Sequence, residues 1–450
     1  MKSICLILMG GIFLSSCTND NDYFNNIESE QSLKRVVLTS DEASVLSTYL
    51  QGASISQNDA LKKATAFLAQ RSTRSNSSEK INQTYWVKYE SSLPHMFSST
   101  SKPDSIPLYL INNSNGGSVL ISGDERLPEV LAYTTSGELS LERNGSGSDV
   151  FLDMLPQFVS STIDNFELKY DSILTVVKSK VGMDKQVGPV PLQRVETEYS
   201  EWEATYTYAP LTNTEWGQDY PYNTMMDRIN CGGSLLCPPL GCTTVAIAQI
   251  LSQHKYPVVF DGVSVNWIKM CEKPQGFDLS SEYLSQLCHM MKSIADDVLI
   301  DKSCTGSSSN ISKAKEYFLN NGYTTDAISQ YDENKIINSL SNSRPLYTRG
   351  TNKSTQEGHA WVIDGANKKE RTCTERIFEY RGSNPKPSNP IVPSEWKLIE
   401  TTFRTEEQKF VHCNYGWDGL NNGYYNHAIF NTDLGNFNSE LQILPNIKRK

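Results

Sequence analysis

The stretch "PLGCTTVAIAQILSQHKYP", residues 239–257, places Cys242 directly before a run that is typical of a helix. From Thr243 to Lys255 there is no glycine or proline, and Pro257 ends the run. Unpaired N–H groups and the positive end of the dipole at a helix N-terminus favour a thiolate over a thiol. The pattern makes Cys242 a candidate nucleophile, while a buried structural cysteine is the commoner role of this residue type.

The composition is that of an ordinary folded protein, with 38% hydrophobic and 20% charged residues in a chain of 450. A chain of this length predicts two globular units together with a targeting sequence. The formal net charge is −10, and there is no block of lysine or arginine. These features argue against nucleic acid as a partner.

The first twenty residues, "MKSICLILMGGIFLSSCTND", are typical of an export signal. The apolar run over residues 4–14 is shorter than the roughly 20 residues of a membrane-spanning helix. "LSSC", which ends at Cys17, resembles a bacterial lipobox, in which the cysteine is lipidated. We therefore predict a signal peptide over residues 1–16, a lipid on Cys17 and a tether over residues 17–35. A plain signal peptide is the alternative.

The ten cysteines are unevenly distributed, because residues 18–230 contain none. Cys5 and Cys17 lie in the signal region, and Cys231 and Cys237 flank a short loop that a disulfide could bridge. Sequence alone does not determine the connectivity. The cysteines of the second half are Cys231, Cys237, Cys242, Cys271, Cys288, Cys304, Cys373 and Cys413.

The cysteine-free half mixes helix and strand patterns. A capped helix is expected from Ser56, where Asp59 completes a capping pair, and a hairpin is expected over residues 106–122. The stretch "VGPVPLQRVETEYSE", residues 187–201, has no periodicity and predicts a linker or processing segment. The proline-rich residues 381–396 predict a loop.

A nucleophilic thiol needs a base, and two of the six histidines are candidates. His254 lies twelve residues along the same helix, about 18 Å from Cys242, and is too far away. His359 in "EGHAWVIDGA" is expected at the edge of a strand, where a residue of a cleft would lie. Asn414, two residues after His412, could form a hydrogen bond that orients the ring of His359. We favour His359 as base, with His412 as the alternative. No comparable signal accompanies the remaining histidines, His95, His289 and His427.

Four blocks stand out in the second half: "WGQDYPYN" (216–223), "GCTTVAIAQILSQHKYP" (241–257), "GHAWVIDGA" (358–366) and "VHCNYGWDGLNNGYY" (411–425). Their order and their residues resemble the streptopain family of secreted bacterial cysteine peptidases, which are members of the papain superfamily. The cysteine-free half, notably "ALKKATAFLAQ" (60–70) and "LYLINNSNGGSVLISGDERLPEVLAY" (108–133), resembles the inhibitory propeptide of that family.

The resemblance implies a role for individual residues. Cys242 would be the nucleophile and His359 the base. Gln218 would donate its amide to the oxyanion together with the backbone N–H of Cys242. Asn414 and Trp417 would support and shield the histidine.

Other residues of these blocks are expected beside the cleft. Tyr415 stands where the family has a tryptophan, which makes its part in shielding or substrate binding uncertain. Gly358 and Trp361 belong to the histidine block and are expected to bind substrate or shield the base. The stretch over residues 381–396 lengthens the connection between the two strands and is expected to lie near one end of the cleft.

The resemblance also implies the fold and the domain order. We expect an α+β, papain-like catalytic domain over residues 191–450, in which a helical part carries the nucleophile and an antiparallel sheet carries the histidine. An α+β inhibitory propeptide is expected over residues 36–190. Cleavage between Lys185 and Arg194 would release a cysteine endopeptidase from the lipid anchor, at the cell surface, in the periplasm or outside the cell.

The expected partners are protein or peptide substrates and the propeptide itself, and no cofactor or metal is expected. Three other classes are weighed against this interpretation. They are an inactive papain-like binding protein or adhesin, an acyl transferase that uses the same residues, and a metal site on Cys231, Cys237, Cys242 and His254. The spacing of the last is not typical of zinc.

Overall fold

The computed structural model describes residues 35–69, 79–91, 104–114, 116–143, 148–181, 193–352, 358–380, 396–431 and 439–450. The chain divides into two compact units. One contains residues 1–37, 186–198 and 374–403, and the other contains residues 38–185, 199–373 and 404–450. The candidate catalytic residues all lie in the second unit.

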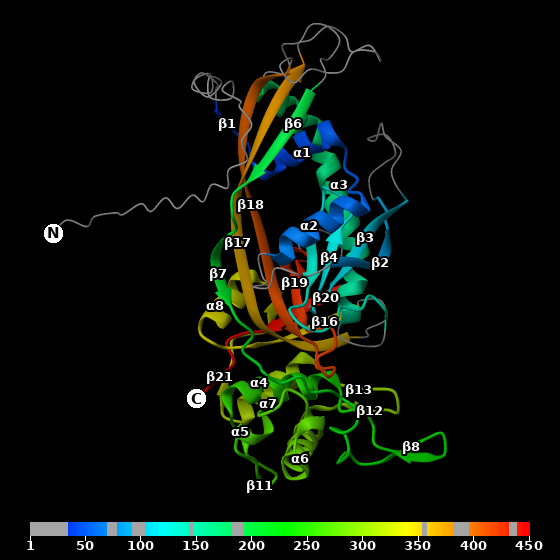
Figure 1. Ribbon diagram of the computed structural model, residues 1–450. Coiled ribbons are helices and arrows are strands. Elements are labelled where there is room, and N and C mark those ends of the chain that lie inside the picture. The colour runs from blue at the N-terminus through cyan, green and yellow to red at the C-terminus, as the bar shows by residue number, and fades with distance from the viewer. Residues whose placement is uncertain are drawn as a thin grey trace, which may run out of the picture. The chain divides into compact units, whose positions relative to one another are not determined.

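The helices and strands of the described residues are shown in Figure 1. The helices are α1 Ser40–Gln51, α2 Gln57–Ala69, α3 Ser148–Lys180, α4 Cys242–His254, α5 Trp267–Met270, α6 Ser281–Val298, α7 Ile311–Asn320, α8 Glu333–Ser341 and α9 His427–Phe430. The strands of the N-terminal half are β1 Arg35–Val37, β2 Glu79–Lys88, β3 Ser105–Asn113, β4 Ser118–Ser122 and β5 Val130–Tyr133. Those of the C-terminal half are β6 Gln193–Tyr199, β7 Glu203–Tyr208, β8 Ile229–Cys231, β9 Ser234–Leu236, β10 Val259–Phe260, β11 Val263–Ser264, β12 Asp301–Lys302, β13 Ser307–Ser308, β14 Tyr323–Thr324, β15 Ser329–Gln330, β16 Leu346–Asn352, β17 Gly358–Tyr380, β18 Trp396–Asn414, β19 Gly423–Asn426, β20 Ser439–Leu444 and β21 Lys448–Arg449.

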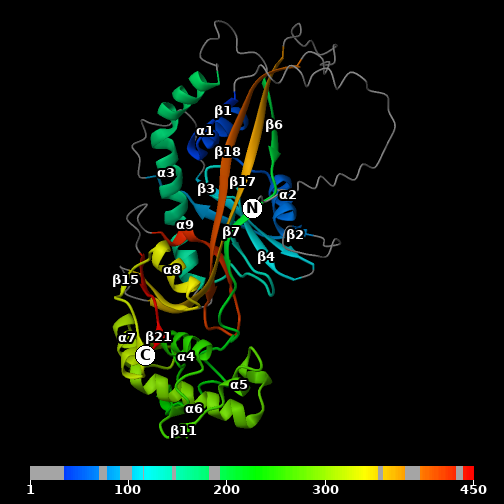
Figure 2. The ribbon, with the colours of Figure 1, turned by 90° about the vertical axis from the view of Figure 1, so that its left-hand side faces the viewer.

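The predicted helix at Cys242 is confirmed as α4, which is buried along most of its length. Its apolar residues pack between α6, α7 and one face of the strands β16, β17 and β20. Tyr347, Ala360 and Val362 supply that face. Figures 1 and 2 show α4 to α7 lying close together. An all-round apolar helix is expected where neighbours cover every side, and this fixes the position of Cys242.

Both histidine segments form strands, as predicted. His359 is the second residue of β17, and His412 lies near the end of the antiparallel strand β18. Both strands belong to one large sheet with the order β15-β20-β16-β17-β18-β19-β5-β4-β3-β2, and eight short strands form four separate two-stranded sheets. The mixed fold agrees with the expected α+β, papain-like class.

In the N-terminal half, helices cover both faces of the strands β2 to β5. Leu108 and Leu110 of β3 face α3, whereas Tyr109 and Ile111 face α2. This alternation along one strand explains why β3 is apolar on both sides. The expected hairpin is present as β3 and β4, and the Ser56 hydroxyl caps α2 through Asp59.

The sheet continues from the catalytic half into the propeptide-like half. β19 pairs with β5 in antiparallel register, with Tyr424 opposite Tyr133 and Tyr425 opposite Ala132. The Tyr133 ring stacks on the Tyr424 ring at 4.8 Å and meets the Phe410 ring edge-on at 5.1 Å. The two halves therefore share backbone pairing as well as apolar core at this place, which we call the β5–β19 junction.

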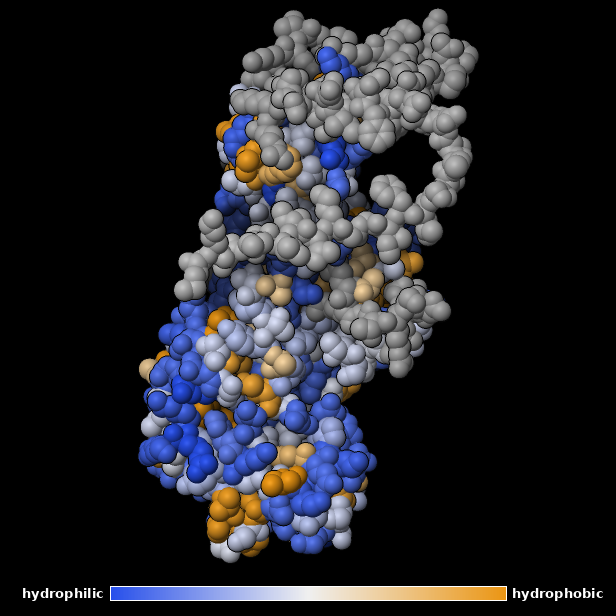
Figure 3. All heavy atoms as spheres, turned by 60° about the vertical axis from the view of Figure 1, so that its left-hand side comes forward, coloured by the Kyte–Doolittle hydropathy of each residue, from blue (hydrophilic) through white to orange (hydrophobic). Residues whose placement is uncertain are grey.

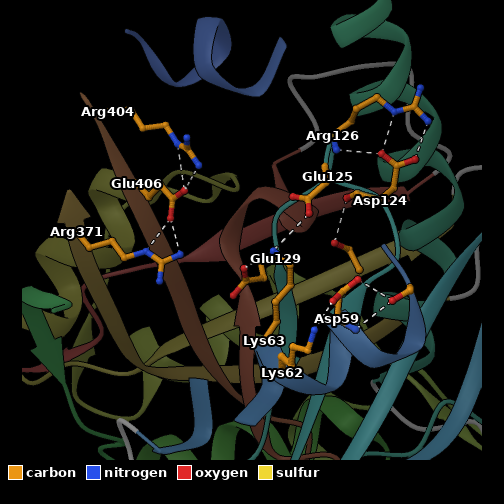
Figure 4. Close-up of polar contacts among 12 residues, drawn as sticks. Asp59, Lys62, Lys63, Asp124, Glu125, Arg126, Glu129, Arg371, Arg404 and Glu406 are labelled. Atoms are coloured by element: carbon orange, nitrogen blue, oxygen red, sulfur yellow. Dashed lines mark hydrogen bonds and ion pairs between the residues drawn. The ribbon is translucent and has the colours of Figure 1, made fainter. Parts of the chain in front are cut away.

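Charged residues accompany the junction (Figure 4). Arg371 and Arg404 both bind Glu406 on the catalytic half, and Lys63 of α2 binds Glu129 on the propeptide half. These residues line a cavity of about 380 Å³. In each group the charges are partly buried and paired, which limits their desolvation cost.

The predicted linker is partly a strand. β6 covers Gln193–Tyr199 and pairs with β17, and β1 pairs in parallel with β18 at residues 401–403. Because β17 extends over 23 residues, it offers a partner for a segment that has no periodicity of its own. The expected loop over residues 381–396 lies outside the described residues except for Trp396, as do the signal peptide and almost all of the tether.

The surface in Figure 3 is mainly hydrophilic where the residues are described, with small, separate hydrophobic patches. Isolated apolar side chains of this kind are usual on folded proteins. Among the described helices, none is both long enough and apolar enough to cross a membrane.

Candidate active site

The backbone before α4 positions the candidate nucleophile. Gly241 has a φ of 81°, and a Cβ atom at this residue would lie 2.9 Å from the carbonyl oxygen of Ser307. Glycine meets both constraints without strain. Cys242 then begins α4, where the N–H groups of the first turn have no partner within the helix. The thiol therefore lies at the positive end of the helix dipole.

The thiol of Cys242 is paired with His359. Burial by itself raises the pKa of this thiol, but the charge of His359 and a hydrogen bond from its ring oppose that effect. The charge of Arg349 and the backbone N–H of Ala360 act in the same direction as His359. Together they lower the pKa of Cys242 from 9.0 to about 6. The thiolate is thus the prevailing form at neutral pH.

Other free cysteines of the described residues have the opposite electrostatics. Burial raises the pKa of Cys271 to about 11, and it also raises the pKa values of Cys288 and Cys413. None of these three thiols has a histidine among the causes of its shift. A lowered pKa therefore distinguishes Cys242 from these buried cysteines.

The other side of the His359 ring faces the loop after β18. Nε2 of His359 lies 3.5 Å from the carbonyl oxygen of Tyr415, which can only accept a hydrogen bond. The Trp417 ring lies 6.4 Å from the imidazole, centre to centre. His359 is only 9% exposed. The carbonyl and the indole thus lie where they can orient and cover the base.

Asn414 is placed differently from our expectation of direct contact with the base. Its Nδ2 donates to the hydroxyl of Thr212 and to the carbonyl of Thr214, and its Oδ1 accepts from the N–H of Gly416. The described residues show no hydrogen bond between Asn414 and His359. Asn414 instead holds the backbone on both sides of Tyr415, whose carbonyl meets the imidazole.

Gln218 lies close to the nucleophile through its backbone. Its carbonyl accepts a hydrogen bond from the N–H of Leu240, two residues before Cys242, at 2.9 Å. The side chain is buried, and its Nε2 finds no hydrogen-bond partner within the described part of the chain. A buried donor without a partner is costly unless another molecule supplies the acceptor. An oxyanion formed at Cys242 would be such an acceptor.

Tyr415 and Trp361 differ from the expectation that they shield the base or bind substrate. Both side chains are 1% exposed and pack against each other with ring centres 5.8 Å apart. They face the core that includes α9 and part of α3, because alternate residues of a strand point to opposite faces. Gly358 is exposed, and a Cβ atom there would lie 2.8 Å from the guanidinium of Arg349.

His412, the alternative base, belongs to another group. Its Nδ1 lies 2.6 Å from a carboxylate oxygen of Asp364, and Asp364 also accepts from the N–H of Thr212. Asp364 is fully buried. These hydrogen bonds connect β17, β18 and the segment at Thr212. His359 is therefore the histidine that interacts with the Cys242 thiol.

The alternative metal site is contradicted by the structure. Cys231 forms a disulfide with Cys304, not with Cys237 as the short loop had suggested. His254 ends α4, at the opposite end from Cys242. Within the described residues there is no group of three or more potential metal ligands.

Sequence reasoning missed one residue at the site, Arg349. It lies on β16 opposite Ala360, the neighbour of His359. Arg349 belongs to no recognisable motif. Alternation along the strand does predict that it shares a face of the sheet with Tyr347, two residues earlier. Its charge reaches Cys242, as the pKa of that thiol shows.

A helix that begins with an activated thiol, opposed by a histidine on an antiparallel sheet, defines a cysteine peptidase of the papain type. Comparisons with known proteins agree. Residues 216–265 and 259–425 match the Peptidase C10 family, and residues 52–158 match the Spi protease inhibitor family. The chain therefore carries a streptopain-like, papain-type cysteine peptidase domain and a Spi-like propeptide domain, as a zymogen does.

Individual relatives are distant in sequence. Streptopain of Streptococcus pyogenes is 23% identical over 358 residues, which cover 71% of this chain and 73% of the relative. The thiol protease/hemagglutinin PrtT of Porphyromonas gingivalis is 20% identical over 426 residues, or 87% of this chain and 41% of the relative. A solved fragment of Prevotella intermedia prointerpain A gives a TM-score of 0.46 at 16% identity, covering 80% of this chain and 98% of the fragment.

Proposed function

We propose that the protein is an exported endopeptidase in which the thiolate of Cys242 attacks peptide bonds and His359 serves as general acid and base. The observation that carries this proposal is the position of Cys242 as the first residue of the buried helix α4, beside His359. The charge of His359 and a hydrogen bond from its ring lower the pKa of this thiol against the effect of burial. The intact set of nucleophile, base and unpaired Gln218 amide favours catalysis over a binding protein or adhesin.

The chemical steps follow from these positions. The thiolate adds to the substrate carbonyl, and the resulting oxyanion accepts from the N–H of Cys242 and from Nε2 of Gln218. Protonated His359 gives its proton to the leaving amine. Neutral His359 then takes a proton from water, which hydrolyses the thioester and restores the thiol group.

Covalent labelling tests the proposal. The full chain without its export signal, cut in the linker, is expected to gain one adduct of an epoxide thiol-protease reagent by intact mass. Cys242→Ala should gain none and should cleave no protein. Cys237→Ser, which removes another free and partly exposed thiol, should label and cleave like the unaltered protein. Labelling that persists in Cys242→Ala, or an unlabelled but folded unaltered protein, would contradict the proposal.

Removal of the Gln218 amide gives a second prediction. Gln218→Ala is expected to lower kcat by about 100 to 1000-fold with a smaller effect on KM, because an oxyanion donor acts mainly in the transition state. Steady-state kinetics on one peptide measure the change. Cys242 should still be alkylated, which separates loss of the oxyanion donor from loss of the fold. A full-rate variant would remove Gln218 from the mechanism.

Processing is proposed to occur between residues 185 and 194, with the propeptide over residues 36–190 and the catalytic domain over residues 191–450. The separate family matches, 52–158 and 216–425, support a boundary between them. β6 places residues 193–199 in a strand, which favours cleavage before it. Export and a lipid on Cys17 are supported by the sequence pattern of the first twenty residues.

A further inference from the structure

Arg349 lies on the face of the sheet that covers the nucleophile. Tyr347, two residues earlier on β16, shares that face, and its hydroxyl lies 2.9 Å from the hydroxyl of Thr243, the residue after Cys242. Opposite Arg349 on β17 is Ala360, whose N–H donates to the thiol. On this face of β16, Arg349 is therefore the neighbour of Tyr347, which contacts the start of α4.

The guanidinium of Arg349 is partly buried, and within the described part of the chain it forms no ion pair with a carboxylate. Burial raises the pKa of Tyr347 and the charge of Arg349 opposes that rise, which places the guanidinium near the Tyr347 hydroxyl. Two other partly buried arginines of the second unit are paired with carboxylates: Arg126 with Asp124 and Glu167, and Arg371 with Glu406. A guanidinium has five donors, and a partly desolvated one is best satisfied by a carboxylate.

Gly358 allows the guanidinium to approach the backbone directly before His359. A Cβ atom at Gly358 would lie 2.8 Å from Nη2 of Arg349 and 2.8 Å from the carbonyl oxygen of Gly350. Gly358 is exposed and Arg349 is partly exposed. The guanidinium therefore lies against the edge of β17 next to His359.

We propose that Arg349 binds an acidic side chain of the peptide substrate close to the scissile bond, so that the enzyme prefers substrates with Asp or Glu at one subsite. This inference rests on the proposed peptidase function and names a substrate class for it. The chemistry fits because a guanidinium recognises a planar carboxylate through two parallel hydrogen bonds.

A peptide library and a matched peptide pair test the subsite. The activated full chain is first given a mixed peptide library, and cleavage sites are read by mass spectrometry. The position most enriched in Asp and Glu then defines two quenched fluorescent peptides that differ only as Glu or Gln at that position. The unaltered enzyme is expected to show a kcat/KM at least about 10-fold higher for the Glu peptide.

Arg349→Gln should abolish this ratio. Any loss that comes from a weaker Cys242 thiolate affects both peptides equally and cancels in the ratio. Arg349→Lys should retain part of the ratio, and Arg349→Glu should favour a Lys peptide at the same position. Arg344→Gln removes a guanidinium that contacts Asn446 and should leave the ratio unchanged.

Several results would overturn the proposal. A library without acidic enrichment excludes the subsite even if no variant folds. Equal losses on both peptides in Arg349→Gln, with a higher pH midpoint for alkylation of Cys242, would make Arg349 a residue that stabilises the thiolate instead. Cleavage of no peptide together with an unlabelled Cys242 would refute the peptidase function itself, and the subsite with it.

Discussion

His359→Ala is expected to lower kcat/KM by about 100 to 10,000-fold on any peptide, because it removes the general acid and base. It should also change how Cys242 ionises. In the unaltered protein the thiol is protonated as the pH falls through about 6, so alkylation should have its midpoint near pH 6. Without the charge and hydrogen bond of His359, burial dominates and the midpoint should move to higher pH.

Alkylation rates between pH 4 and pH 10, followed by mass, measure both midpoints. His289→Ala is the matched control, since that ring contacts the carbonyl of Phe260 on the far side of the helical core. Its midpoint and activity should resemble those of the unaltered protein. A His359→Ala variant with an unmoved midpoint would show that another group stabilises the thiolate.

Tyr133→Ala is expected to release the propeptide more readily than any other single change at the junction. The ring stacks on Tyr424 and meets Phe67 and Phe410 edge-on, and truncation of a buried aromatic residue costs about 3–5 kcal/mol. Part of this free energy comes from the contact with Phe67 inside the propeptide, so the variant also destabilises the propeptide itself. We expect Cys242 of the linker-cut protein to be alkylated about 10 to 100-fold faster.

Two further variants isolate the contact across the junction. Tyr133→Phe keeps the ring and loses the hydrogen bond from Asn367, so its effect should be only a few-fold. Tyr109→Ala weakens the same propeptide core without pairing to β19. If Tyr109→Ala releases the thiol as fast as Tyr133→Ala, propeptide stability and not the junction controls access.

The position of the proposed nucleophile, Cys242, could be predicted because it depends on local rules. An unbroken apolar run after Gly241 predicts a helix that begins at Cys242, and alternation predicts the strand that carries His359. The short list of histidines then left two candidate bases. Resemblance to a family added Gln218, which has no local signal of its own.

The remaining features depend on tertiary contacts between distant segments. β6 forms because residues 193–199 pair with β17, and Cys231 bonds to a cysteine 73 residues away. The carbonyl oxygen of Tyr415 contacts His359. Every residue has a backbone carbonyl, so the sequence does not indicate this contact. Arg349 is one charged residue in a short strand, and only its register with Ala360 brings it to the thiol.

The β5–β19 junction has a consequence for the timing of activation. A cut in the linker breaks one covalent bond, but paired strands and stacked rings still hold the two pieces together. The cut protein is therefore a complex whose dissociation follows mass action, so dilution favours the free enzyme and a high local concentration of the two pieces favours the inhibited complex. Dilution after release from the producing cell would therefore dissociate the propeptide and complete the activation that the cut in the linker started.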